Sequence, residues 1–115
     1  MHREFLAPRD EEVLDAIGQW PDTDESGARV LGWHSDDGAS LVLSYDVLGR
    51  SVRVRWTNGG ELLLDIFRES ATRLAFTSDS SAMNVSVDFH MGESAGALEI
   101  QVAPSFSVRD RLLFR

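Results

Sequence analysis

The sequence feature that most constrains the fold is an unbroken alternation of apolar and polar residues over positions 83–91. The apolar positions are Met83, Val85, Val87, Phe89 and Met91. Successive side chains of a β-strand point to opposite faces of a sheet, so this period of two predicts a strand with one buried and one solvated face. Such half-buried strands are typical of antiparallel sheets.

The same period recurs elsewhere, with turn-forming clusters of Gly, Ser, Asp and Asn between the apolar runs. The sequence therefore predicts a single antiparallel sheet of about six strands. The expected strands cover residues 29–35, 41–47, 51–57, 83–91, 97–102 and 106–114.

Residues 8–20 have a helical pattern instead. Pro8 suits the first turn of a helix, and three acidic residues follow it, where they complement the positive end of the helix dipole. The apolar positions Val13, Leu14, Ile17 and Trp20 then line one face, and Pro21 ends the segment. We expect this helix to pack on the sheet, with Trp20 in the core.

Residues 61–75 fit two structures. Their acidic and basic residues occupy one arc of a helical wheel and their apolar residues another, which favours a second helix. The alternative is a further β-hairpin, because Asn58-Gly59 is a strong hairpin-turn signal. In either case the predicted class is α+β, with residues 1–115 forming a single globular domain.

Composition excludes several classes of function. The chain has no cysteine, which excludes disulfides, a thiol nucleophile and thiolate zinc sites. No apolar stretch approaches the roughly 18 residues that span a bilayer, and the first residues lack a signal-peptide pattern. We therefore expect a cytoplasmic protein that does not bind membranes.

Charge is distributed unevenly along the chain. The net charge is −8, and all eleven basic residues are Arg. Residues 1–49 hold eleven acidic residues and three Arg, whereas residues 50–115 hold eight of each. An acidic surface of this kind repels nucleic acid and anionic membranes, and it accelerates the encounter with a basic protein.

No catalytic constellation is evident. Gly92 to Gly96 match G-x-S-x-G, but strands are predicted on both sides and no His follows His90, so a nucleophile elbow is rejected. Asp88 and His90 share one polar strand face and form the best candidate pair for acid–base chemistry, although a solvated face explains them equally well. The acidic clusters lack the spacing of a calcium loop, so we expect no metal or cofactor.

The sequence therefore favours a non-enzymatic protein-interaction domain that binds a basic protein. In acidity, size and lack of a catalytic motif, the chain resembles immunity proteins and antitoxins, which neutralise a basic toxin by presenting carboxylates to it. The candidate contacts are Asp22, Asp24, Glu25, Trp33, Asp36 and Asp37.

The alternative hypothesis is an α+β domain that binds a small ligand in an apolar cleft between sheet and helix. An exposed sheet edge would also permit a homodimer, but no sequence feature predicts one.

Overall fold

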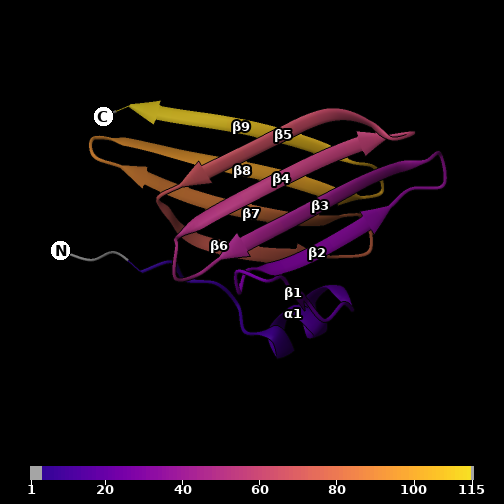
Figure 1. Ribbon diagram of the computed structural model, residues 1–115, viewed down its shortest axis with the longest axis horizontal. Helices are drawn as coiled ribbons and strands as arrows, with labels where there is room; N and C mark the ends of the chain where they lie inside the picture. Colours follow the sequence, from indigo (N-terminus) through magenta and orange to yellow (C-terminus); the bar gives the residue numbers. More distant parts are fainter. Residues whose placement is uncertain (1–3, 115) are drawn as a thin grey trace.

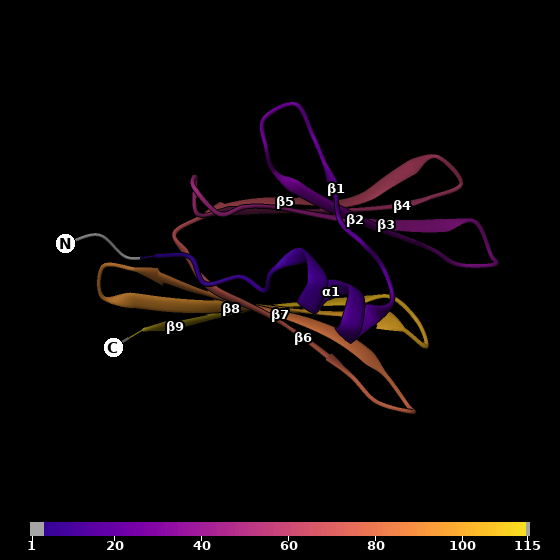
Figure 2. The ribbon, with the colours of Figure 1, turned by 90° about the horizontal axis from the view of Figure 1, so that it is seen from below.

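Two antiparallel sheets face each other, and a short helix lies along one side of them (Figures 1 and 2). The computed structural model describes residues 4–114, with side chains described as far as residue 112. The predicted α+β class is confirmed, but the prediction of a single sheet of about six strands is wrong, because the described residues form nine strands in two sheets.

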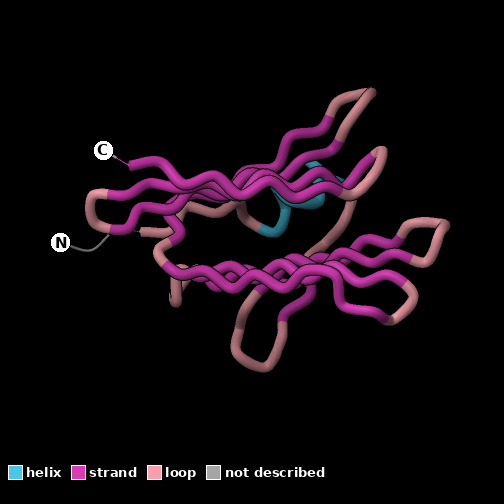
Figure 3. The backbone as a smooth tube through the Cα atoms, turned by 90° about the horizontal axis from the view of Figure 1, so that it is seen from above, coloured by secondary structure: helices cyan, strands magenta, loops and turns pink. Residues whose placement is uncertain are grey.

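The first sheet contains five strands in sequence order, and the second contains four. Figure 3 shows the two sheets as separate layers. The first is formed by β1 (Asp22–Thr23), β2 (Arg29–His34), β3 (Ala39–Asp46), β4 (Ser51–Asn58) and β5 (Glu61–Glu69). The second is formed by β6 (Ala71–Ser78), β7 (Met83–Met91), β8 (Ser94–Ala103) and β9 (Ser107–Phe114). All six predicted strands are present, with ends shifted by a few residues.

Residues 61–75 are the main correction. They form neither a helix nor a hairpin of their own, because they divide between β5, which pairs with β4, and β6, which pairs with β7. The Asn58-Gly59 turn signal is correct for the β4–β5 hairpin, where Gly59 and Gly60 have φ of 59° and 85°. The spacing of the apolar residues fits an amphipathic helix and a strand with apolar residues on both faces equally well. Hydrogen bonding to β4 selects the strand.

One residue carries the chain from the first sheet to the second. Ser70 has φ of 68°, in the left-handed region that a non-glycine residue seldom adopts. Its carbonyl accepts the backbone N–H of His90 at 3.1 Å, and the next N–H, of Ala71, donates to the Arg50 carbonyl at 3.0 Å. These hydrogen bonds fix the crossing at both sheets.

The core lies between the sheets and follows the alternation of each strand. Paired residues share a face, so one interior row of the first sheet reads Leu31, Leu43, Val54 and Ile66. The first three are fully buried and Ile66 is partly buried. The facing sheet contributes the buried residues of the 83–91 alternation, which are Val85, Val87 and Phe89. The predicted alternation of residues 83–91 is confirmed at these three positions, whereas Met83 is partly buried and Met91 is exposed.

The helix α1 (Asp10–Ile17) is shorter than the predicted 8–20 segment. Arg9 is its N-cap, and its backbone N–H donates to the Glu12 side chain at 3.0 Å. Gly18 ends it in the left-handed conformation with φ of 73°. Trp20 therefore lies beyond the helix and is 52% exposed, so its predicted core position is wrong.

Segments outside the strands cover two sheet edges. The backbone of Leu6 bonds to the Thr72 carbonyl and the Leu74 N–H, each at 2.9 Å, and so extends the second sheet at β6. The Gln19 amide pairs with the N–H and the carbonyl of Gly32, each at 3.2 Å, as a neighbouring strand would. Within the described chain, no helix combines the length and apolar character needed to cross a membrane.

The opposite side of the sandwich is closed by an ion pair. Arg68 on β5 donates two hydrogen bonds to the Asp110 carboxylate on β9, at 2.6 and 2.7 Å. The same guanidinium lies 5.4 Å from the centroid of the Phe89 ring, within the range of a cation–π contact. This pair joins the last strand of one sheet to the last strand of the other.

Candidate functional site

The predicted acidic contacts lie at two opposite ends of β2. Asp22, Asp24 and Glu25 belong to β1 and the β1–β2 loop, whereas Asp36 and Asp37 form the turn between β2 and β3. The six residues of β2 separate the two groups by about 20 Å at about 3.4 Å per residue. The structure therefore does not bring the five carboxylates together.

In the β1–β2 loop, Asp24 holds the backbone in place. Its Oδ1 accepts hydrogen bonds from the Ser26 hydroxyl at 2.6 Å, the Ser26 N–H at 2.9 Å and the Ala28 N–H at 3.0 Å. These bonds, with the Ser26 hydroxyl first, lower the pKa of Asp24 below its usual value. Asp22 and Glu25 are exposed. The loop projects away from the second sheet (Figure 2).

The β2–β3 turn is built in a similar way. The Ser35 hydroxyl donates to Asp37 and, with a backbone bond from Ala39, lowers the pKa of that carboxyl. Asp36 is exposed. Trp33 is paired with Leu41 on the interior face of the sheet and is packed against the core.

Asp88 and His90 lie on the outer face of the second sheet, where Asp88 is exposed and His90 is partly buried. His34 belongs to the other sheet and bonds through Nδ1 to the Ser40 hydroxyl at 2.9 Å. No group of three or more His, Asp or Glu side chains suited to a metal occurs among the described residues. The Gly92–Gly96 match forms the β7–β8 turn and the start of β8, which is a hairpin rather than a strand-to-helix elbow.

Several arginines of the strands pair with carboxylates of their own sheet, whereas Arg68 pairs with Asp110 of the other sheet. Arg53 donates two hydrogen bonds to Asp65, at 2.9 and 2.7 Å, on the outer face of the first sheet. On the second sheet, Arg109 and Arg111 approach Glu99, at 3.9 and 2.9 Å. Such cross-strand pairs balance acidic against basic side chains within the sheets, so the surplus negative charge belongs to the first half of the chain.

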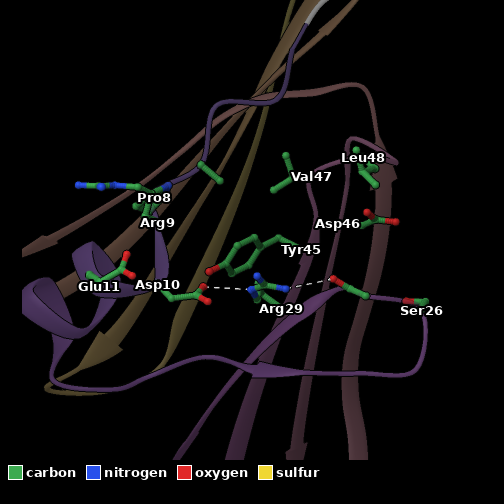
Figure 4. Close-up of a pocket in the computed structure, with 12 residues that line it drawn as sticks. Pro8, Arg9, Asp10, Glu11, Ser26, Arg29, Tyr45, Asp46, Val47 and Leu48 are labelled. Carbon is green, nitrogen blue, oxygen red and sulfur yellow. Dashed lines mark hydrogen bonds and ion pairs between the residues drawn. The ribbon is translucent and has the colours of Figure 1, made fainter.

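A cleft of about 510 Å³ lies at the Asp24 end of β2 (Figure 4). We call it the Tyr45 cleft. It is bounded by the chain leading into α1, by the β1–β2 loop and by the β3–β4 turn. Its lining residues are Ala7, Pro8, Arg9, Asp10, Glu11, Ser26, Gly27, Arg29, Tyr45, Asp46, Val47 and Leu48.

An ion pair and a tyrosine form the base of this cleft. Arg29 Nε donates to Asp10 Oδ1 at 3.0 Å, which raises the pKa of the guanidinium. Tyr45 is only 2% exposed, and its buried hydroxyl has no hydrogen-bond partner in the structure. Burial, followed by the nearby Asp10 charge, raises the pKa of Tyr45 to about 12. The hydroxyl therefore stays protonated at neutral pH.

Sequence reasoning missed this cleft. The sequence predicts residues 41–47, which include Tyr45, only as a strand, and it predicts the three acidic residues after Pro8, which include Asp10, only as favourable charges in the first helical turn. One signal was present, because the β3–β4 turn contains Val47 and Leu48, and both are exposed, Leu48 at 97%. Two large apolar residues in a turn otherwise rich in polar and small residues can indicate a contact surface.

Comparison with known proteins gave one informative match. No family model matches the chain, and no curated protein matches it. The fold is similar to that of a chain in the contact-dependent growth inhibition toxin–immunity protein complex from Klebsiella pneumoniae 342. The TM-score is 0.83 over 97% of this chain and 100% of the other, with 12% sequence identity. At that identity the likeness establishes the fold alone.

Proposed function

We propose that this chain is a non-enzymatic immunity protein, which binds a basic toxin domain and neutralises it. The observation that carries the proposal is the fold likeness to a chain of a toxin–immunity protein complex, over nearly the full length of both chains. The sequence had led to the same class from charge and from the lack of a catalytic motif. The two arguments are independent, because the fold comparison does not use the net charge.

Electrostatics gives this proposal a physical mechanism. The first 49 residues carry the whole surplus of negative charge, and most of their acids lie on α1, on β1 and the β1–β2 loop, on the β2–β3 turn and at the end of β3. A field of this sign attracts a basic partner and raises the association rate, and rim carboxylates then contribute to the bound complex. We propose Asp22, Asp24, Glu25, Asp36 and Asp37 as contacts, with the two ends of β2 to be tested separately. Trp33 is not retained as an anchor, because it packs against the core.

The experiment has two stages. The purified chain captures basic proteins from a lysate of its source at low salt, and a salt gradient releases them for identification. Each captured protein is then expressed in bacteria with and without this chain. We expect one of them to stop growth when expressed alone and to be tolerated when this chain is present. If every captured protein is harmless when expressed alone, the proposal is wrong.

Charge variants then locate the contacts. One variant neutralises the loop group (Asp22→Asn, Asp24→Asn, Glu25→Gln), and another neutralises the turn group (Asp36→Asn, Asp37→Asn). A matched control neutralises Glu69 and Glu93, two exposed acids of the second half. We expect weaker binding and a smaller salt dependence from a contact group and little change from the control. If all three variants bind equally well, the acidic half does not form the interface.

The small-ligand alternative also has a structural basis. A groove of about 440 Å³ runs between α1, the segment before it and β6, with Leu6, Ala16 and Phe76 among its lining residues. A ligand that binds the folded state must raise its stability. A thermal-shift screen of small molecules would identify such a ligand, and a screen without any stabilising molecule would exclude this alternative.

A further inference from the structure

The Tyr45 cleft has a polar group that the fold leaves unsatisfied. Burying a hydroxyl without a hydrogen bond destabilises a folded protein, and natural structures seldom leave one unpaired without a reason. The Tyr45 hydroxyl is such a group, and it points across the cleft toward Asp10 (Figure 4). A partner atom at this position would satisfy it.

The charges around the cleft favour a cation. Both arginines of the lining are already paired, Arg29 with Asp10 at 3.0 Å and Arg9 with Glu12 at 3.2 Å. Asp10 uses only Oδ1 in that pair, and a carboxylate has about four acceptor positions, so its other oxygen can accept more hydrogen bonds. Glu11 adds a further negative charge at the rim. With Asp46, the lining holds three carboxylates and two arginines, so its net charge is negative and disfavours an anion.

The rim is apolar on its other side. Val47 is 45% exposed and Leu48 is 97% exposed, both on the β3–β4 turn, and Pro8 lies on the opposite wall. Arginine and lysine combine a charged end with an apolar stem, which packs on such surfaces while the charge reaches a carboxylate. The cleft volume lies within the usual range of about 300–1,000 Å³ for binding pockets.

We infer that the Tyr45 cleft receives an arginine or lysine side chain of the basic protein partner. The charged end bonds to Asp10 and to the Tyr45 hydroxyl, and the stem lies against Val47 and Leu48. This inference rests on the proposed function for the identity of the partner. It places the principal contact at the Asp24 end of β2 rather than at the Asp36 end.

The first test uses a tri-arginine peptide as the probe, with a tri-glutamate peptide as its control. The chain is labelled with nitrogen-15, and the backbone amide shifts are followed at low salt. We expect tri-arginine to shift the amides of Arg29, Tyr45 and Leu48 more than those of Asp36 and Asp37, and tri-glutamate to shift neither group. Equal shifts at both ends of β2 would indicate diffuse attraction to negative charge and would overturn the inference.

The second test separates binding from stability. Tyr45→Phe removes the unsatisfied hydroxyl, so we expect the midpoint of thermal unfolding to stay the same or rise while affinity for tri-arginine falls fivefold or more. Glu11→Gln, on the exposed helix surface, should lower affinity without affecting folding. Glu69→Gln, at an exposed acid of the second half, is the matched control and should bind as the wild type does. Unchanged affinity in both cleft variants would overturn the inference.

The captured toxin distinguishes the two proposals. If a toxin is captured and neutralised but binds Tyr45→Phe and Glu11→Gln as tightly as the wild type, the inference fails and the proposed function stands. If tri-arginine binds in the cleft but no captured protein is toxic, the proposed function fails and the cation site stands.

Discussion

The pair Leu74→Ala and Phe67→Ala tests the assignment of residues 61–75 to two strands. A helical wheel places both side chains on one apolar arc, so a helix would bury them together. In the structure they belong to different sheets, and Leu74 is 3% exposed whereas Phe67 is 59% exposed. The two substitutions should therefore have very different effects on the free energy of unfolding.

The magnitudes follow from burial. Leu74→Ala removes three carbon atoms from the core, worth about 0.8 kcal/mol each in transfer free energy, and leaves a cavity, so we expect a loss of about 3 kcal/mol. Phe67 already exposes more than half of its side chain, so its removal should cost about 1 kcal/mol. At about 4 °C per kcal/mol, the melting temperature should fall by about 12 °C and about 4 °C respectively.

Urea unfolding measured by tryptophan fluorescence gives both free energies. Trp33 and Trp56 are packed against the core, so their emission should report global unfolding. The dependence of the free energy on urea should be the same in both variants, because neither changes the surface exposed on unfolding by much. A loss from Phe67→Ala as large as that from Leu74→Ala would refute the two-strand assignment.

Three further predictions concern single contacts. Asp110→Asn breaks the pair with Arg68, whose hydrogen bonds lower the pKa of Asp110. Because the Asp110 side chain is 44% exposed, the free energy of unfolding at pH 7 should fall by less than about 1 kcal/mol. In urea titrations at acid pH, the difference from wild type should vanish as the pH falls below the usual aspartate pKa of about 3.9 and through the lower pKa of the folded state. Gly96→Ala should destabilise the fold by about 1–3 kcal/mol in thermal melts, because the new Cβ would lie 3.0 Å from a backbone carbonyl oxygen of β9. Gly32→Ala, with no non-adjacent atom within 4 Å of the new Cβ, should stabilise it by about 0.4–1 kcal/mol. The opposite order would contradict the register of β8 with β9. Gln19→Glu keeps the acceptor for the Gly32 N–H but loses the donor to the Gly32 carbonyl, so chemical denaturation should show a loss of about 0.5–1.5 kcal/mol, and no loss would mean that the edge contact does not stabilise β2.

The strands that the sequence predicts well are those with one solvated face. Residues 83–91 alternate because the second sheet is packed on one side only, so burial leaves a period of two in the sequence. β5 is at the edge of its sheet and is exposed on both faces over its first residues, so its apolar residues follow no single period. Local pattern alone could not have assigned it to a strand.

The division into two sheets was also beyond the sequence. A turn between paired strands and a crossing between sheets both need only a short break in the strand pattern. The crossing residue, Ser70, is neither glycine nor proline, so the sequence does not mark where the chain passes to the second sheet. The Tyr45 cleft could not be predicted from the sequence either, because it is the packing of α1 across the end of the sheet that brings Asp10 and Tyr45 together. Loop composition predicted the acidic turns correctly but could not show that β2 separates them.

Every ladder among the described strands joins neighbours in sequence, so each sheet is wound from one continuous half of the chain. The halves meet covalently at Ser70, and Leu6 reaches back to pair with β6 in the other half. Contacts that are local in sequence form with little loss of chain entropy, which leaves the docking of one half on the other as the step of greatest cost. A chain cut at Ser70 would therefore separate the two sheets covalently, and the first fragment would carry the Leu6 backbone that covers the β6 edge of the second.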